Sequence, residues 1–189
     1  MKAFVRAVGI DDAPFKFSQK SVGVFFTVMR APNYIEGFMR TEIAVDGNDA
    51  TERIVEKISS SRFCEQIDVI FLDGCTLGGF NIVDIHAVHE HTGIPVLTIT
   101  RRKPDMDEIR NTLQAKFADW EERFQRMTQE LHAVNAIRNP IYVGIAGTDI
   151  ETAKGFITRF TVQGSVPEPL RVAHMLGSLS VFGESRRGR

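Results

Sequence analysis

The order of the apolar segments along the chain is the feature that most constrains its fold. Three strand-like segments, at residues 3–11, 22–29 and 37–45, come first and are joined by short turn-rich stretches. A helix with one apolar face begins after them, near Asp49. The sequence therefore predicts a sheet whose first three strands are connected by turns before any helix appears.

After this helix, strands and helices alternate. We predict strands at residues 68–72, 95–100 and 141–145 and helices at about 81–91, 104–133, 149–160 and 167–182. This order is typical of a ribonuclease H-like sheet, so the predicted fold class is α/β: one mixed sheet flanked by helices, with strand order 3-2-1-4-5. A dinucleotide-binding Rossmann fold is disfavoured, because Gly74, Gly78 and Gly79 have the wrong spacing for its fingerprint.

Two aspartates stand at the ends of buried strands. Asp11 closes the first apolar run and Asp73 closes the run at residues 68–72. In the predicted order these strands are neighbours, so the two carboxylates meet at one edge of the sheet, where open α/β sheets bind ligands. Neighbouring carboxylates repel each other unless a cation lies between them, which favours a divalent-metal site. The alternative is that both are turn or helix-initiating aspartates.

Composition narrows the class of protein. The 189 residues carry a net charge of −1 and are 43% hydrophobic, which fits one compact domain over residues 1–189. No apolar stretch approaches the ~20 residues of a membrane span, and the amino terminus lacks a signal-peptide pattern, so we expect a cytoplasmic protein. Cys64 and Cys75 are expected to be reduced thiols. The charge argues against a nucleic-acid coat, yet residues 101–103 and 186–189 are local basic strips.

Longer strings carry a resemblance to known families. The segments at residues 68–74 and 92–102 are similar to the core of endonuclease V, and Asn33-Tyr34-Ile35-Glu36-Gly37 resembles its strand-separating wedge. Over nearly its whole length the chain more closely resembles an archaeal relative, the endonuclease dU family. The strings that carry this match are residues 45–52, 78–85 and 167–174. The resemblance implies metal-dependent cleavage of DNA or RNA at deaminated bases such as uracil or hypoxanthine.

The resemblance also implies metal ligands. Endonuclease V uses Asp, Glu and Asp around Mg²⁺, and its two aspartates correspond to Asp11 and Asp73, with Mg²⁺ or Mn²⁺ as the expected ion. For the middle carboxylate the junction before the first helix offers Asp46, Asp49 and Glu52. Asp46 and Asp49 are favoured, although Asp49 also fits a helix N-cap. The histidine that endonuclease V carries near its end is absent from residues 167–171, and Glu168 is the candidate ligand in its place.

Other residues are candidates for contacts with nucleic acid. Tyr34 and Ile35 correspond to the wedge, and Arg101 or Arg102 follows the fifth strand, where it is placed to bind phosphate. Arg171 lies beside Glu168 at the start of the last helix. We expect all these residues to gather around one carboxylate-lined groove. The alternative function is a non-catalytic nucleic-acid-binding or regulatory protein that has kept the fold.

Overall fold

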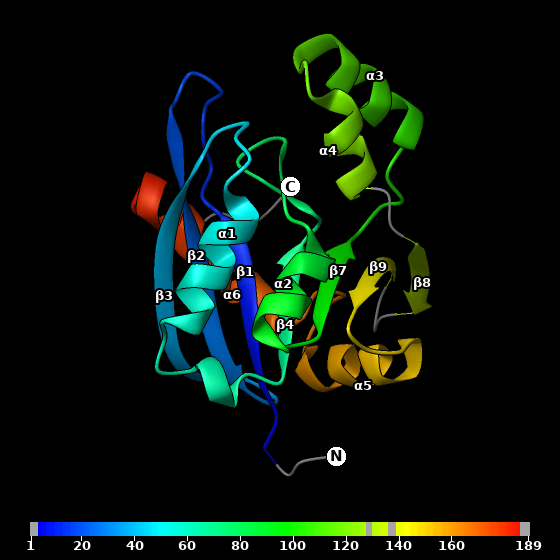
Figure 1. Ribbon diagram of the computed structural model, residues 1–189. Helices are drawn as coiled ribbons and strands as arrows, with labels where there is room; N and C mark the ends of the chain where they lie inside the picture. The colour runs from blue at the N-terminus through cyan, green and yellow to red at the C-terminus, as the bar shows by residue number, and fades with distance from the viewer. Residues whose placement is uncertain (1–3, 128–129, 136–138, 186–189) are drawn as a thin grey trace.

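The computed structural model describes residues 4–127, 130–135 and 139–185. Its centre is a seven-stranded mixed sheet in the order β3-β2-β1-β4-β7-β9-β8 (Figure 1). The strands are β1 (Arg6–Asp12), β2 (Ser21–Arg30), β3 (Tyr34–Ala44), β4 (Val69–Asp73), β7 (Val96–Thr100), β9 (Pro140–Ala146) and β8 (Leu131–Asn135). A separate two-stranded ribbon consists of β5 (Thr76–Leu77) and β6 (Asn81–Ile82).

Helices cover both faces of the sheet. They are α1 (Ala50–Ser59), α2 (Ile85–Thr92), α3 (Met106–Lys116), α4 (Trp120–Met127), α5 (Ile150–Phe160) and α6 (Glu168–Phe182), with one 3-10 turn, η1 (Cys64–Gln66). In Figure 1, α1 and α2 lie in front of the sheet and α6 lies behind it. None of the helices in the described part of the chain is long and apolar enough to cross a membrane.

Each face of the sheet has its own apolar core. On one face, Ile54 of α1 and Val88 of α2 are buried in the same cluster as Val8 and Ile10 of β1. On the other face, residues of α5 and the start of α6 are buried against Val69, Phe71 and their neighbours on β7 and β9. Side chains of a strand alternate between faces, so consecutive residues of β1 and β4 belong to different cores. This alternation decides which carboxylates share a face.

The predicted α/β class is confirmed, and the first five of the six predicted strands lie in the predicted order 3-2-1-4-5 as β3-β2-β1-β4-β7. The sheet continues beyond β7 with two further strands. β9 pairs antiparallel with β7, and β8 pairs antiparallel with β9. The strand predicted at residues 141–145 is therefore β9, and the sequence analysis did not predict its position beside β7.

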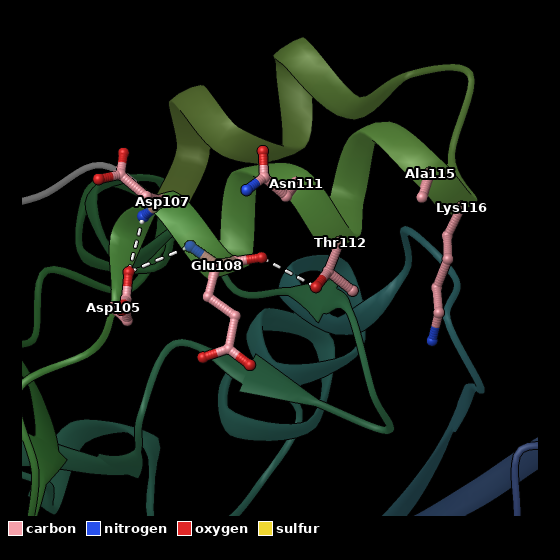
Figure 2. Close-up of a pocket in the computed structure, with 7 residues that line it drawn as sticks. All are labelled: Asp105, Asp107, Glu108, Asn111, Thr112, Ala115 and Lys116. Atoms are coloured by element: carbon pink, nitrogen blue, oxygen red, sulfur yellow. Dashed lines mark hydrogen bonds between the residues drawn. The ribbon is translucent and has the colours of Figure 1, made fainter.

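The prediction of a single long helix over residues 104–133 is wrong. The segment forms α3, α4 and β8 instead. Asp105 begins α3 by accepting hydrogen bonds from the backbone N–H groups of Asp107 and Glu108 at 3.1 Å each (Figure 2). The end of the segment pairs with the open edge of β9, so tertiary contacts override the helical preference of its residues. The helix predicted at 81–91 is also shorter, because residues 81–82 form β6 and Asp84 caps α2.

Arg123 fixes the α3–α4 pair to the rest of the domain. This arginine is 5% exposed and donates from its Nε to the Asp119 carboxylate at 3.0 Å. Its Nη1 also donates to the carbonyl oxygens of Gly47 at 3.0 Å and Phe80 at 2.7 Å. The guanidinium further lies 4.2 Å from the ring centroid of Phe117. The two helices are therefore tied to the loop before α1 and to the segment before β6.

Two glycines allow α6 to lie directly on β1. A Cβ atom at Gly9 would lie 2.2 Å from the carbonyl carbon of Pro169, and one at Gly177 would lie 2.8 Å from the carbonyl oxygen of Asp12. Both contacts are with backbone, which cannot move aside as a side chain can. The absence of side chains at these positions therefore sets the distance between α6 and the strand that ends in Asp11.

We expect Gly9→Ala to lower the free energy of unfolding by about 1 to 3 kcal/mol, because the new methyl group would push α6 off β1. Urea denaturation with a helical circular dichroism signal measures the effect. Gly23→Ala is the matched control on β2, since its Cβ would meet only the side-chain atoms of Phe25 and Arg40, at 3.2 to 3.5 Å. Equal stabilities for the two variants would show that the close packing of α6 is not required.

Candidate metal centre

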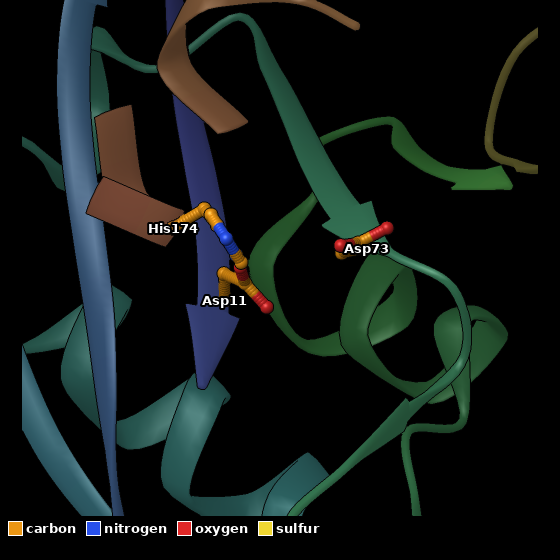
Figure 3. A group of neighbouring side chains, drawn as sticks. All are labelled: Asp11, Asp73 and His174. Atoms are coloured by element: carbon orange, nitrogen blue, oxygen red, sulfur yellow. The ribbon is translucent and has the colours of Figure 1, made fainter. Parts of the chain in front are cut away.

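Strand pairing brings Asp11 and Asp73 together. β1 and β4 are parallel neighbours with Ile10 opposite Leu72, and the two aspartates are the next residues along each strand. Both follow the alternation that places them on the face covered by α6. One ligand atom from each of Asp11, Asp73 and His174 lies within 4.8 Å of the other two (Figure 3). No other group of this kind occurs among the described residues.

His174 enters the site from α6. Its Nδ1 lies 2.8 Å from Oδ2 of Asp11, whose side chain is almost fully buried. The other carboxylate oxygen of Asp11 accepts a hydrogen bond from the backbone N–H of Asp12 at 2.9 Å. Asp11 is therefore held from two sides, which fixes the orientation of its carboxylate toward Asp73.

The electrostatics of the site favour a bound cation. Desolvation raises the pKa of Asp73 to about 6, and the negative charge of Asp11 adds to the rise, while Arg101 and His174 oppose it. Desolvation also raises the pKa of Asp12 to about 7, with the charge of Asp11 as the second cause. The hydrogen bond to Asp11 raises the pKa of His174 above its ordinary value of 6.5. Negative charges are thus crowded in a poorly hydrated place, and a divalent cation relieves that repulsion.

The donor atoms fit such an ion. Two carboxylates and one imidazole offer oxygen and nitrogen ligands, a combination that suits Mn²⁺ and is compatible with Mg²⁺. Three protein ligands leave a six-coordinate ion with further positions for water or phosphate oxygen. The geometry therefore supports a divalent cation held by Asp11, Asp73 and His174.

Asp12 points away from this cluster, as alternation along β1 requires. Its carboxylate accepts a hydrogen bond from the backbone N–H of Gly78 at 2.6 Å. Asp46, which was expected to be a metal ligand, forms hydrogen bonds with the same loop. It accepts from the N–H of Phe80 at 2.8 Å and donates its own N–H to the carbonyl of Gly78 at 2.8 Å. The two aspartates thus hold the segment between Asp73 and Phe80 in place.

Asp49 is likewise engaged outside the cluster. It immediately precedes α1 but makes no side-chain capping bond, so the expected N-cap interaction is absent. Its carboxylate instead accepts from the N–H of Ala44 at 3.1 Å and from Nδ2 of Asn81 at 2.6 Å. Glu52, the third candidate, lines a pocket between α1 and α2. The structure therefore brings none of the three candidates for the middle carboxylate into the three-ligand group.

Glu168 also lies outside the group. It is 8% exposed, and both its carboxylate oxygens accept hydrogen bonds from Arg171 at 2.7 to 3.0 Å. His174, rather than Glu168, is the residue of α6 that reaches Asp11. Residues 167–171 contain no histidine, and the histidine that contacts Asp11 comes further along the same helix.

The structure separates the Tyr34–Ile35 hairpin from the carboxylates. Tyr34 pairs with Arg30, which pairs with Arg6 at the beginning of β1, whereas Asp11 lies at the opposite end of that strand. The five residues between the two ends correspond to about 16 Å of strand. Tyr34 is 60% exposed, and the guanidinium carbon of Arg30 lies 4.7 Å from the centroid of the Tyr34 ring. The expected gathering of wedge and metal site in one groove is therefore wrong.

Arg101 does lie beside the group formed by Asp11, Asp73 and His174. It directly follows β7, the strand next to β4, and its charge acts on both Asp73 and His174. Arg102 is the next residue and is exposed. Sequence reasoning missed His174 as a member of this site and Asp12 as a support for the loop after β4. The available signals were the Asp11-Asp12 pair itself and the spacing on the last helix, where His174 lies two turns beyond Pro167.

Comparisons with known proteins identify the relatives of this chain. The sequence profile of a family described as endonuclease dU matches residues 3–181. A UPF0215 protein from Methanothermobacter thermautotrophicus is 42% identical over 189 residues, which cover 98% of this chain and 92% of the relative. A UPF0215 protein from Thermococcus gammatolerans is 39% identical, with coverage of 99% and 97%.

Solved structures share the fold. A protein of unknown function from Archaeoglobus fulgidus superimposes with a TM-score of 0.86 at 38% identity, covering 95% of this chain and 99% of that one. Endonuclease V from Ciona intestinalis, in complex with a 24mer DNA containing an inosine followed by a ribo-adenosine, has a TM-score of 0.60 at 14% identity and coverage of 90% and 83%. Human endonuclease V gives 0.60 at 13% identity, with coverage of 92% and 83%.

Proposed function

This chain belongs to the endonuclease dU family, and from that premise we propose that it is a metal-dependent endonuclease that cleaves nucleic acid at or near deaminated bases. The family and the fold support a nuclease-like function. The proposed substrate is DNA or RNA that contains uracil or hypoxanthine, and the proposed ion is Mg²⁺ or Mn²⁺. The chemistry would be hydrolysis of a phosphodiester bond close to the altered base.

One observation carries this proposal. Asp11, Asp73 and His174 come from β1, β4 and α6, and each contributes a ligand atom to a group no wider than 4.8 Å. Here two carboxylates and one imidazole share a desolvated corner beside Arg101. This is the arrangement that phosphoryl-transfer chemistry with a bound cation requires.

The roles of the residues follow from their contacts. When bound, a divalent cation supplies neutralisation of phosphate charge and a more acidic water. Asp11 and Asp73 would hold the ion, and His174 would orient Asp11 while completing the ligand set. Arg101, beside Asp73, is placed to bind a phosphate oxygen of the substrate. Asp12 acts through the backbone of Gly78 and keeps the loop after β4 in position.

The direct test is incubation with end-labelled oligonucleotides that contain uracil, hypoxanthine or no altered base, in DNA and RNA, single- and double-stranded. We expect cleavage of altered strands with Mg²⁺ or Mn²⁺ and none with EDTA. Oligonucleotides that are bound but never cut under any of these conditions would favour a non-catalytic binding protein instead.

We expect Arg101→Ala to weaken binding of all substrates to a similar extent, because phosphate contacts carry little sequence information. Loss of one such contact should reduce the slope of log affinity against log salt by about 0.9 for duplex and about 0.7 for single strands. Fluorescence anisotropy at several salt concentrations measures the slope. Arg110→Ala is the control, since Arg110 lies on α3 and stacks on Phe124. An unchanged slope for Arg101→Ala would remove Arg101 from the phosphate site.

A further inference from the structure

An exposed aromatic side chain lies at the same edge of the sheet as the metal centre. Phe17 belongs to the loop that joins β1 to β2, and this loop begins directly after Asp12. The side chain is 64% exposed, equal to Phe4 as the most exposed of the large apolar residues in the described chain. Large apolar side chains at such exposure, next to a functional site, often mark a binding surface.

The ring of Phe17 lies against the loop that follows β4. A Cβ atom at Gly79 would lie 3.2 Å from Cε1 of Phe17, so the ring rests against the loop that Asp12 holds through Gly78. Phe15 contacts the ring edge-on, with centroids 5.4 Å apart. The exposed ring thus packs against Phe15 of its own loop and against the loop after β4. A supported ring presents a stacking surface at little cost in conformational entropy.

A positive charge lies beside this ring. The ammonium of Lys116 lies 5.1 Å from its centroid, and Lys16 and Lys20 are exposed in the same loop. Figure 2 shows Lys116 at the end of α3 with its side chain directed away from the helix. The chain as a whole carries a net charge of −1, so this grouping of lysines is local rather than general. An aromatic face beside cations matches a nucleobase and the phosphate attached to it.

We propose that Phe17 is a stacking platform for a nucleobase of a single-stranded segment and that Lys116 binds the phosphate next to that base. This assignment rests on the proposed function, because it takes nucleic acid to be the substrate. It places base stacking at the carboxylate edge of the sheet, where the Tyr34 hairpin does not reach. Phe17 would position the strand relative to Asp11 and Asp73 without taking part in the chemistry.

The test is binding of a fluorescein-labelled, unmodified single-stranded 20-mer, followed by anisotropy in the presence of EDTA so that no cleavage takes place. We expect Phe17→Ala and Phe17→Leu to weaken binding at least about fivefold, and Phe17→Trp to bind like the parent protein. Phe17→Leu keeps an apolar side chain against Gly79 and guards against a general folding defect. Phe4→Ala is the matched control, since Phe4 is also 64% exposed but precedes β1 at its other end.

Salt dependence separates the two residues. Lys116→Ala should reduce the slope of log affinity against log salt by about 0.7, whereas Phe17→Ala should lower affinity without changing the slope. Equal binding by the Phe17 variants and the parent protein would overturn the platform while leaving the proposed nuclease intact. Weakened binding by Phe17→Leu in a protein that never cuts would support the platform and reject the nuclease. A parent protein that binds no oligonucleotide would overturn the platform.

Discussion

Asp73→Asn is expected to reduce cleavage by at least about a thousandfold while the protein stays folded. The amide keeps the shape of the carboxylate but removes its negative charge, and several kcal/mol of charge stabilisation in the transition state depend on the cation that this charge holds. Cleavage of uracil- and hypoxanthine-containing strands with Mn²⁺ measures the rate. Isothermal titration with Mn²⁺ measures the accompanying loss of metal affinity.

The stability of Asp73→Asn shows whether a loss of cleavage comes from the missing carboxylate charge or from a damaged fold. The pKa of Asp73 is raised to about 6, mainly by desolvation, so the ionised carboxylate opposes folding at pH values above its folded pKa. In EDTA at pH 8, Asp73→Asn should therefore be at least as stable as the parent protein. Asp107→Asn, an exposed acid on α3, is the control for both measurements. Unchanged cleavage by Asp73→Asn would exclude Asp73 from the mechanism.

The two strand-ending aspartates show which part of the site could be predicted. An apolar run that ends in Asp gives both a buried strand and a polar group at its edge, and both features are local in sequence. The order of strands then follows from the three turn-connected strands that precede α1. Because β1 and β4 are adjacent, Asp11 and Asp73 meet without any further information about side-chain packing.

His174 depends on information that is not local. The contact with Asp11 requires α6 to cross β1 at a particular height and rotation, which Gly9 sets through its contact with Pro169. No pattern within residues 167–182 gives that height. Glu168 is a candidate ligand because it lies in the segment where endonuclease V carries its histidine, but its carboxylate is neutralised by Arg171 within the same helix.

The break between α3 and α4 has a similar cause. Apolar residues continue at helical spacing past Phe117, so periodicity alone predicts one helix. The structure has two helices instead, and Arg123 of the second binds the carbonyl oxygens of Gly47 and Phe80, residues far away in sequence. The predicted location of Tyr34 next to the carboxylates is wrong for another reason. The motif around Tyr34 resembles a wedge, but a motif does not show at which end of the sheet its hairpin lies.

His174→Ala is expected to lower the affinity for Mn²⁺ about 10- to 100-fold and to slow cleavage at least as much. The substitution removes one ligand and leaves the buried carboxylate of Asp11 without its side-chain partner. Isothermal titration and single-turnover cleavage measure the two effects. His91→Ala is the control, because His91 is exposed and its Nδ1 lies 2.8 Å from the carbonyl oxygen of Ala87, on its own helix.

The pH dependence of the free energy of unfolding is an independent test of the contact between His174 and Asp11. The pKa of His174 is raised by its hydrogen bond to Asp11, so in metal-free protein the protonated imidazole stabilises the fold. That contribution is fully present below the ordinary pKa of 6.5 and is lost as pH rises through the higher folded value. In EDTA, His174→Ala should therefore destabilise the protein most at acidic pH and progressively less above neutrality.

Protons and metal compete for this pair, which gives the expected behaviour of the parent protein. A metal-binding imidazole must be neutral and its carboxylate partners ionised, so Mn²⁺ affinity should rise with pH across the range in which His174 and Asp73 lose their protons. Asp73 loses its proton at about pH 6, below His174. The rise should therefore continue above pH 6 in the parent protein and stop near it in His174→Ala. Identical affinity profiles for the two proteins would mean that His174 only supports Asp11 and is not a ligand.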